Sequence, residues 1–360
     1  MEYYIFFIVL FLCAFAEVNN LLKNKILFAI LVFLLILFAG TRYEIGTDYM
    51  TYSSLFEICK EGSIIAQLVT VEALFVLLSN VAYSLAGIFL IYALIGVGGK
   101  GIIISKVAYP FTCLLMYYGF CYLFFDMGIM RQGAAIAVCL YSIRYIIKRE
   151  PKKFIFLVFV CTTFIHRSSL FWIFAYFIKP TCLSKKNIYL FLAISFLLGF
   201  IVNEQFLLSV LSVMPSFFSK FGNTIVNIQQ ESLNFGFTSL RKVVIILFLT
   251  NYLCKKLSHQ QIFYKYLINI YFWGVCASLA FVRFPTLAGR GTYFYCVTEI
   301  LLLPLCMKYI KNKFLKNLYF IGLSLYSFLY MRNVINNVNT DSWMNLLYLP
   351  YNSILYKSKF

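Results

Sequence analysis

Long apolar segments alternate with short polar segments along almost the whole chain. Each apolar segment has about 15 to 25 residues, the length of a helix that crosses a lipid bilayer or part of it. The pattern predicts membrane helices over residues 3–18, 26–40, 82–97, 107–124, 130–147, 154–178, 188–202, 240–253, 262–282, 292–307 and 315–331. We therefore expect an all-α fold with about 11 to 13 membrane helices or half-helices.

Two further features of this pattern affect the predicted topology. Residues 62–80 are apolar but contain Gln67 and Glu72, which predicts an amphipathic helix lying on the outer face of the membrane. Residues 154–178 have basic residues at both ends and His166 with Arg167 in the middle. At ~1.5 Å per residue each half covers only ~18 Å, so we expect a hairpin dipping into the membrane or two short spans. Both arrangements place His166 deep in the protein, on the outward side.

Composition agrees with a membrane protein. Hydrophobic residues make up 62% of the chain and charged residues 12%, and the mean hydropathy is +0.85. These values exclude a water-soluble globular protein. We expect residues 1–360 to form a single membrane domain, with residues 41–80 as an outer loop and interfacial helix and residues 203–239 as an outer loop. The 11 cysteines show no metal-type spacing, so we expect no metal site, no cofactor and no disulfide framework.

The positive charge of the chain gives its orientation. The net charge is +18, but the basic residues lie in short loops between apolar segments, so we expect no nucleic-acid partner. The lysine-bearing segments that can share one side contain Lys23, Lys25, Lys100 and Lys106, residues 148–153 and 179–186, Lys255 and Lys256, and residues 308–316. By the positive-inside rule, that side faces the cytoplasm.

Arginine is distributed differently from lysine. Seven of the nine arginines fall on or near the predicted outer side, namely Arg42, Arg131, Arg167, Arg241, Arg283, Arg290 and Arg332. Lysine suffices as a topology signal, whereas the planar guanidinium group can grip a phosphate or carboxylate with two hydrogen bonds. This difference between arginine and lysine favours the binding of an anion on the outer side of the membrane. The alternative is that these arginines reach lipid phosphates at the membrane surface.

Three of these arginines, Arg131, Arg241 and Arg290, lie at predicted outer helix starts. A cation at a helix N-terminus opposes the helix dipole, so a shared anion would explain its presence. Asp126 is the structural alternative for Arg131. The segment 283–291, which contains Arg283 and Arg290, has no acidic residue, and an external anionic ligand is the better explanation there.

The densest polar segment is residues 41–52, TRYEIGTDYMTY, directly after the apolar residues 26–40. Charge this close to the membrane core usually faces a cavity or a partner. The segment is either a functional site or an interfacial loop in which Arg42 extends to the surface and Asp48 caps the next helix. Candidate general bases on the outer side are Asp48, Glu72 and His166, of which we rank Asp48 first as a polar site residue. For His166 the alternative is a hydrogen-bonded packing role, and for Glu72 the polar face of an interfacial helix.

A set of short motifs occurs in order along the chain. They are RYEIGTDYMTY at residues 42–52, an Arg-Gln pair that opens a helix at Arg131 and Gln132, His166 followed by Ser-Ser-Leu, and GRGTYF at residues 289–294. Together they resemble the EpsG family of bacterial membrane proteins, which is allied to the Wzy-type polymerases of O-antigen, capsule and exopolysaccharide. The resemblance covers roughly residues 37–294.

This resemblance implies a glycosyltransferase fold of the C type and a polymerase in the bacterial inner membrane with its site facing the periplasm. Its substrate would be an undecaprenyl-diphosphate-linked oligosaccharide, and its partners would include membrane lipids and a chain-length regulator protein. The leaving diphosphate is strongly negative, so catalysis needs cations more than a strong nucleophile. We expect Asp48, Glu72 and His166 as catalytic candidates. The expected diphosphate- and sugar-binding residues are Arg42, Arg131, Gln132, Arg167, Arg241, Arg283, Arg290 and Tyr293.

Two other functions fit part of the pattern. A lipid-linked oligosaccharide flippase or other transporter would also be polytopic and basic, but it should show internal repeats, and the sequence has none that we detect. An O-antigen ligase would use the same outward arginines and is harder to exclude.

Overall fold

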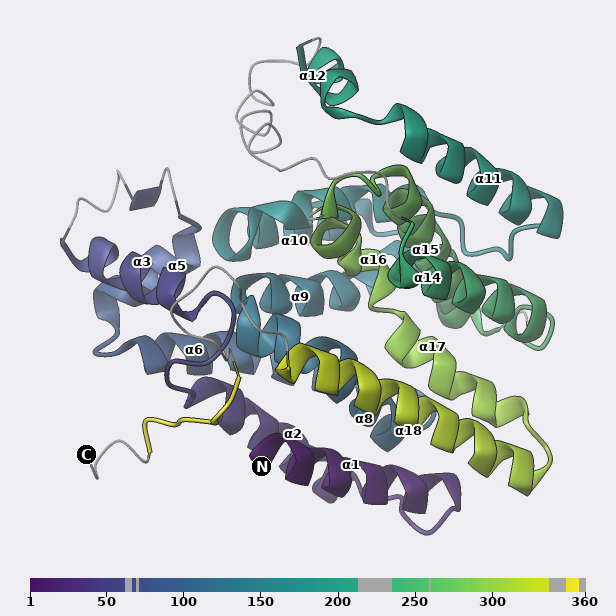
Figure 1. The fold of residues 1–360 in the computed structure, drawn as a ribbon, viewed down its shortest axis with the longest axis horizontal. Coiled ribbons are helices and arrows are strands. Elements are labelled where there is room, and N and C mark those ends of the chain that lie inside the picture. The colour runs from purple at the N-terminus through teal and green to yellow at the C-terminus, as the bar shows by residue number, and fades with distance from the viewer. Residues whose placement is uncertain are drawn as a thin grey trace. The chain divides into compact units, whose positions relative to one another are not determined.

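The computed structural model describes residues 1–61, 67–68, 71–212, 235–258, 260–285, 287–336 and 348–355 (Figure 1). The chain divides into two compact units. Unit 1 contains Met1–Ile173 and Leu303–Phe360, and unit 2 contains Phe174–Leu302. The chain thus leaves unit 1 and later returns to it, so that the first and the last helix belong to the same unit.

The predicted all-α fold is confirmed. Among the described residues the only β-type pairing is an isolated antiparallel bridge between Arg42 and Ser353. The helices of unit 1 are α1 (Glu2–Val18), α2 (Lys25–Gly40), α3 (Tyr49–Glu61), α5 (Ala73–Val81), α6 (Leu85–Ala93), η1 (Leu94–Gly98), α7 (Gly99–Ile104), α8 (Pro110–Tyr117), η2 (Tyr118–Gly128), α9 (Met130–Ile147), α10 (Pro151–Val160), η3 (Cys161–Ile165), η8 (Cys306–Tyr309) and α18 (Lys313–Ile335).

Unit 2 is built in the same way. Its helices are α11 (Lys185–Ile201), α12 (Glu204–Ser212), α14 (Phe237–Phe248), η6 (Leu249–Leu253), α15 (Ile262–Ala280), η7 (Leu287–Gly291) and α16 (Tyr293–Cys296). Two helices run across the boundary between the units, η4 (Arg167–Phe177) and α17 (Glu299–Leu305). Most of the predicted outer loop 203–239 lies outside the described residues.

Four helical stretches of the described chain are long and apolar enough to cross a membrane. They are Leu85–Ile104, Pro110–Gly128, Ile262–Ala280 and Lys313–Ile335, and the shorter α2 is also apolar. Large apolar side chains, including Leu12 on α1, Leu197 on α11 and Leu325 on α18, are exposed rather than packed inside the protein. Such surfaces are stable against lipid and costly in water. The protein is therefore an all-α membrane protein.

Local sequence explains where several helices begin. The side chains of Asn24, Ser184 and Asn312 accept hydrogen bonds from backbone N–H groups in the first turns of α2, α11 and α18. Pro110 and Pro151 are the first residues of α8 and α10, where the missing N–H group has no helical partner to lose.

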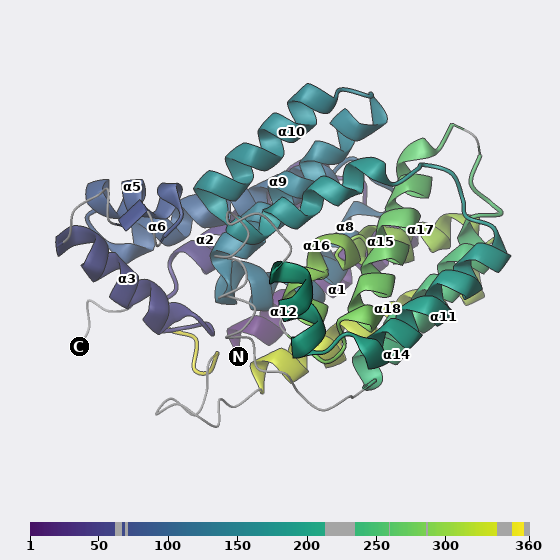
Figure 2. The ribbon, with the colours of Figure 1, turned by 90° about the horizontal axis from the view of Figure 1, so that it is seen from above.

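Unit 1 is a helical bundle in which α1 lies beside α8 and α18, α2 beside α6, and α9 beside η1 and α10 (Figures 1 and 2). A buried carboxylate joins α1 to α8. Glu17 accepts hydrogen bonds from the backbone N–H groups of Phe111 and Thr112 and from the Thr112 hydroxyl. A carboxylate at a helix N-terminus satisfies N–H groups that have no helical partner and complements the helix dipole.

The structure differs from two of the expected helices. Residues 292–307 do not form one helix but break into α16, α17 and η8. The Thr298 hydroxyl donates to the Tyr295 carbonyl at 2.9 Å, and Pro304 lacks an N–H group, so the helical hydrogen bonding is interrupted twice. The expected helix over residues 62–80 is interrupted at Val71 and Glu72, which are not helical, and α5 begins after them at Ala73.

Candidate functional site

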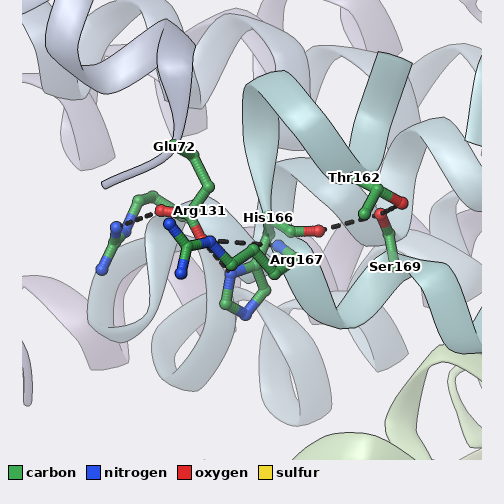
Figure 3. Close-up of polar contacts among 6 residues, drawn as sticks. All are labelled: Glu72, Arg131, Thr162, His166, Arg167 and Ser169. Atoms are coloured by element: carbon green, nitrogen blue, oxygen red, sulfur yellow. Dashed lines mark hydrogen bonds and ion pairs between the residues drawn. The ribbon is translucent and has the colours of Figure 1, made fainter. Parts of the chain in front are cut away.

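Three side chains from distant parts of unit 1, those of Glu72, Arg131 and His166, meet in one place (Figure 3). Glu72 is the residue before α5, Arg131 is the second residue of α9, and His166 lies between η3 and η4. One Glu72 oxygen, Oε2, forms an ion pair with Nη1 of Arg131. The other, Oε1, lies 3.1 Å from Nδ1 of His166 and accepts a weaker contact from the backbone N–H of Arg167 at 3.4 Å. Glu72 thus bridges a cation and an imidazole.

Local hydrogen bonds fix the corner that carries His166. The helical backbone stops at Ile165, and His166 is extended, with φ −161° and ψ 124°. The Ser169 hydroxyl donates to the His166 carbonyl at 2.8 Å and lies 3.0 Å from the Thr162 hydroxyl (Figure 3). The serine that follows His166 in the motif therefore closes the turn. The helix break predicted in the middle of residues 154–178 is confirmed.

Burial and charge set the ionisation of Glu72, which is only 7% exposed. Burial alone raises the pKa of this carboxyl group, but the hydrogen bond with His166 and the charge of Arg131 outweigh it and lower the pKa to about 2. Glu72 is therefore a carboxylate at neutral pH and must accept the Nδ1 proton of His166. The expectation that Glu72 lies on the solvated face of an interfacial helix is wrong, because the side chain is turned into the protein.

Aromatic side chains lie around the Arg131 guanidinium. The Arg131 guanidinium carbon lies 5.4 Å from the ring centre of Tyr52 and 5.8 Å from that of Phe75. Such contacts stabilise a cation that has left water. Burial, reinforced by the nearby charge of Asp48, raises the pKa of Tyr52 to about 12. The phenol therefore keeps its proton at neutral pH and can only donate or accept a hydrogen bond.

The arrangement has the geometry of an oriented base. With Nδ1 held by Glu72, the second ring nitrogen of His166 points away from the carboxylate (Figure 3). The His166 side chain is 23% exposed, whereas Glu72 is nearly covered. A neutral imidazole held in one tautomer by a carboxylate can accept a proton at Nε2 and be stabilised as the cation that forms.

The polar segment 41–52 differs from the interfacial-loop interpretation at Arg42. Arg42 is 1% exposed, so it does not extend to the membrane surface, and its guanidinium carbon lies 3.9 Å from the ring centre of Phe89. Asp48 precedes α3, and the backbone N–H of Tyr52 donates to its carbonyl. Asp48 and Arg42 form no ion pair.

The structure corrects the pairing expected for Asp126. Asp126 accepts from Nζ of Lys100 at 2.7 Å, and Arg131 pairs with Glu72 instead. Lys100 is 0% exposed, so it is a buried charge within Leu85–Ile104 rather than a topology signal in a loop. The Lys100 ammonium also donates to the Gly133 carbonyl at 2.8 Å. A Cβ atom on Gly133 would lie 2.8 Å from Oδ1 of Asp126, which explains why glycine follows the Arg131–Gln132 pair.

Gln132 is itself buried and lies one residue further along α9 than Arg131. Arg167 is the residue after His166, and its side chain is exposed. Of the expected site residues in unit 1, the structure brings Glu72, Arg131 and His166 into direct contact.

The expected arginines of unit 2 have different surroundings from one another. Arg241 on α14 pairs with Glu299 at 3.4 Å, and the Tyr271 hydroxyl donates to the same carboxylate at 2.8 Å. Arg283 donates to the Phe200 carbonyl at 3.5 Å. Arg290 is exposed on η7, and Tyr293 is buried in α16. Arg241 therefore has an acidic partner, 58 residues away, that its neighbours in sequence did not suggest.

Two buried residues close to these side chains, Lys242 and Tyr52, were not predicted from the sequence. Lys242 on α14 is 4% exposed and donates to the Ser278 hydroxyl at 2.8 Å and the Ala288 carbonyl at 3.2 Å. Tyr52 packs its ring between the site and α6 through Phe75 and Phe89. The only signal for Lys242 was a lysine inside an apolar segment, away from the other basic clusters.

No group of three or more His, Cys, Asp or Glu side chains within the described ranges is placed to hold a metal ion. A comparison with protein-family models finds a match to the EpsG family over residues 25–353. No curated protein matches the chain, and no solved structure matches it. Because the family match spans most of the 360 residues, the chain belongs to the EpsG family, and this membership gives it a general role in polysaccharide biosynthesis.

Proposed function

We propose that the protein is a glycosyltransferase that joins lipid-linked oligosaccharide repeat units into a surface polysaccharide. The donor would be undecaprenyl-diphosphate-linked, and the site would face the periplasm from the bacterial inner membrane. The single observation that carries this proposal is the contact of Glu72 with both Arg131 and His166. It places an oriented base beside a cation in a protein whose family acts in polysaccharide biosynthesis.

The proposed step is a displacement at the anomeric carbon of one repeat unit. A sugar hydroxyl of the acceptor unit attacks that carbon, and the bond between the carbon and the diphosphate oxygen breaks. The hydroxyl proton passes to Nε2 of His166, and the undecaprenyl diphosphate leaves. Glu72 holds Nδ1–H and stabilises the imidazolium that forms, so His166 is the catalytic residue and Glu72 a positioning residue.

Cations are needed because negative charge builds up on the leaving diphosphate. In unit 1, Arg131 lies beside the base and Arg167 follows it directly in the chain. The Arg167 side chain is exposed, whereas that of Arg131 is 17% exposed, so Arg167 is the more accessible of the two to a ligand. The arginines of unit 2, Arg283 and Arg290 above all, are proposed as a second diphosphate- or sugar-binding group.

The experiment is deletion of the gene in its host, followed by analysis of surface glycan and of lipid-linked intermediates. A polymerase deletion should leave single repeat units on the cell surface, and the wild-type gene should restore the polymer ladder. Loss of all surface glycan would instead indicate a flippase, and accumulation of free lipid-linked polymer a ligase. Polymer formation by purified protein from one lipid-linked repeat would then identify the donor directly.

A further inference from the structure

Arg42 is a buried cation without an acidic partner. It is 1% exposed, and none of the ion pairs of the described residues includes it. Its Nη1 donates to the Ala39 carbonyl, but Nε and Nη2 have no hydrogen-bond partner in the part of the chain that the structure describes. Leaving a buried charge and its donors unpaired is strongly unfavourable. Burial accordingly lowers the pKa of the Arg42 guanidinium from its usual value.

The loop that carries Arg42 keeps its own acidic residues away from it. Glu44 is exposed and has a left-handed backbone, with φ 55°. Gly46 follows with φ +105°, and a Cβ atom there would lie 2.4 Å from the Met127 carbonyl oxygen. The loop is therefore folded tightly onto η2 in a conformation that only glycine allows at this point. Neither Glu44 nor Asp48 pairs with Arg42, although both lie within six residues of it.

Several hydroxyl groups lie near Arg42. Four tyrosine phenols, those of Tyr52, Tyr122, Tyr348 and Tyr351, lie close enough to interact electrostatically with Arg42. Three of them donate to backbone carbonyls: Tyr122 to Leu35, Tyr348 to Leu123 and Tyr351 to Phe38. The buried Tyr52 hydroxyl donates to no backbone carbonyl of the described residues and interacts with the Arg131 guanidinium instead. The Thr47 hydroxyl has no hydrogen-bond partner among these residues.

The C-terminal segment 348–355 covers this position. The backbone N–H of Tyr43 donates to the Asn352 carbonyl at 3.0 Å, and that of Ile354 donates to the Thr41 carbonyl at 2.9 Å. The Tyr351 ring stacks on Phe38 with centroids 3.9 Å apart. The residues on both sides of Arg42 are thus tied to this segment, which keeps water from the guanidinium.

We propose that Arg42 is a binding site for a phosphate oxyanion, enclosed by residues 348–355. Nε and Nη2 of Arg42 donate to two phosphate oxygens, and the Tyr52 hydroxyl donates to the same group. A guanidinium fork with an adjacent neutral donor matches a phosphate, and the anion supplies the charge that Arg42 lacks. Because segment 348–355 closes the site, phosphate binding and the docking of this segment are linked.

The phosphate can come from the diphosphate of the lipid-linked donor or from free diphosphate in solution. The first source rests on the proposed function, and the second does not. The test therefore measures binding and catalysis separately. Purified protein in detergent is titrated with inorganic diphosphate and, in a parallel arm, with undecaprenyl diphosphate, and its unfolding temperature is recorded. A ligand that binds only the folded state raises that temperature, and at a given concentration a tighter ligand raises it more.

Both ligands should stabilise the wild-type protein, and Arg42→Met should weaken binding by about tenfold or more, since charge-assisted hydrogen bonds are lost. Without ligand, Arg42→Met should be at least as stable as the wild type, because an unpaired buried cation is removed. Arg144→Met removes an exposed arginine at the far end of α9 and should bind as the wild type does. Stabilisation by undecaprenyl diphosphate alone would assign the site to the lipid-linked substrate.

No stabilisation of the wild type by either ligand would overturn the proposal, as would an Arg42→Met protein that responds like the wild type. If Arg42→Met does not accumulate, Arg42→Lys retains the charge but not the fork and should still bind diphosphate more weakly than wild type. Equal binding by Arg42→Lys would contradict the two-donor contact. The His166→Asn variant should keep the diphosphate response while losing polymer formation, so that failure of the catalytic proposal and failure of this one give different results.

Discussion

Oε1 of Glu72 lies 3.1 Å from Nδ1 of His166, although 94 residues separate the two in the chain. The contact depends on three backbone features: the start of α5 at Ala73, the helix break at His166, and the position of Arg131 in the first turn of α9. Each of these features brings a polar side chain to the same place in the protein, where a buried polar group must be hydrogen-bonded. Their convergence on one carboxylate is the best structural argument for a reaction centre.

Substitution of the base should slow polymerisation without removing the protein from the membrane. General base catalysis contributes about 10² to 10⁴ in rate, so His166→Asn should lose about that much. Glu72→Gln should also slow the reaction, and the double variant should be little worse than His166→Asn alone, because the two residues act as one unit. Initial rates of polymer formation at matched membrane abundance measure this. Glu61→Gln, a substitution at an exposed acidic residue, is the control. Strictly additive losses of rate in the double variant would show that Glu72 does not act through His166.

The low pKa of Glu72 predicts a pH dependence of stability. The folded-state pKa of about 2 lies below the ordinary 4.5, so folding favours the carboxylate. This contribution, about 3 kcal/mol, is complete above pH 4.5 and is lost as the pH falls toward 2. The unfolding temperature of purified protein should therefore fall more steeply between pH 5 and pH 3 for the wild type than for Glu72→Gln. Glu61→Gln should follow the wild type, and parallel curves for all three proteins would contradict the assignment.

The buried pair of Lys100 and Asp126 should behave as a structural element. Asp126→Asn leaves the Lys100 ammonium without a counter-charge, which should cost roughly 3–5 kcal/mol in the free energy of unfolding. Adding Lys100→Met should recover most of that loss, since the uncompensated cation is removed. Membrane abundance and unfolding temperature of the single and double variants measure this. The exposed Lys106→Met serves as control, and a double variant as unstable as Asp126→Asn would show that the pair does more than balance charge.

The arginines predicted on the outer side should differ from the lysines predicted on the cytoplasmic side in their tolerance of exchange. Arg290→Lys and Arg131→Lys keep the charge but lose one of two hydrogen bonds to an anion, each contributing roughly 1.5 to 3 kcal/mol. Such a loss in the transition state slows the reaction by about ten- to more than a hundredfold, and we expect mainly single-repeat product. Lys308→Arg and Lys313→Arg should keep the full polymer ladder. Full ladders from both arginine variants would leave the sorting of arginine and lysine as a matter of topology.

The orientation can be tested by labelling with a membrane-impermeant thiol reagent. Single cysteines at positions 48 and 288 should react in intact cells, and those at positions 151 and 312 only after permeabilisation, as the positive-inside rule predicts. The background should carry serine at the partly exposed Cys13, Cys182 and Cys254. Reaction of position 48 from the cytoplasmic side alone would place the site on the wrong face for a periplasmic polymerase.

Apolar segments and short motifs were enough to predict the fold class and the family. Each predicted apolar segment lies mostly on helical residues, because a segment surrounded by lipid must satisfy its backbone hydrogen bonds internally, and a helix does so locally. The helix break near His166 could also be predicted, since basic residues at both ends of 154–178 indicate that both ends face the same side of the membrane. The motif that includes Arg131 and Gln132 opens α9 as expected.

The partners of the charged residues could not be predicted in this way. Asp126 is five residues from Arg131 in sequence but pairs with Lys100. Arg241 pairs with Glu299, which is 58 residues away in sequence. The sequence left Glu72 open between a catalytic role and the polar face of an interfacial helix, and only the structure places it, buried, against Arg131 and His166. The structure also buries Arg42 with no acidic partner among the described residues. Helix formation depends on neighbours within about four residues, which the sequence shows directly. Which charges meet depends on how helices far apart in the chain pack together, and in a low-dielectric interior that packing decides each ionisation and each pairing.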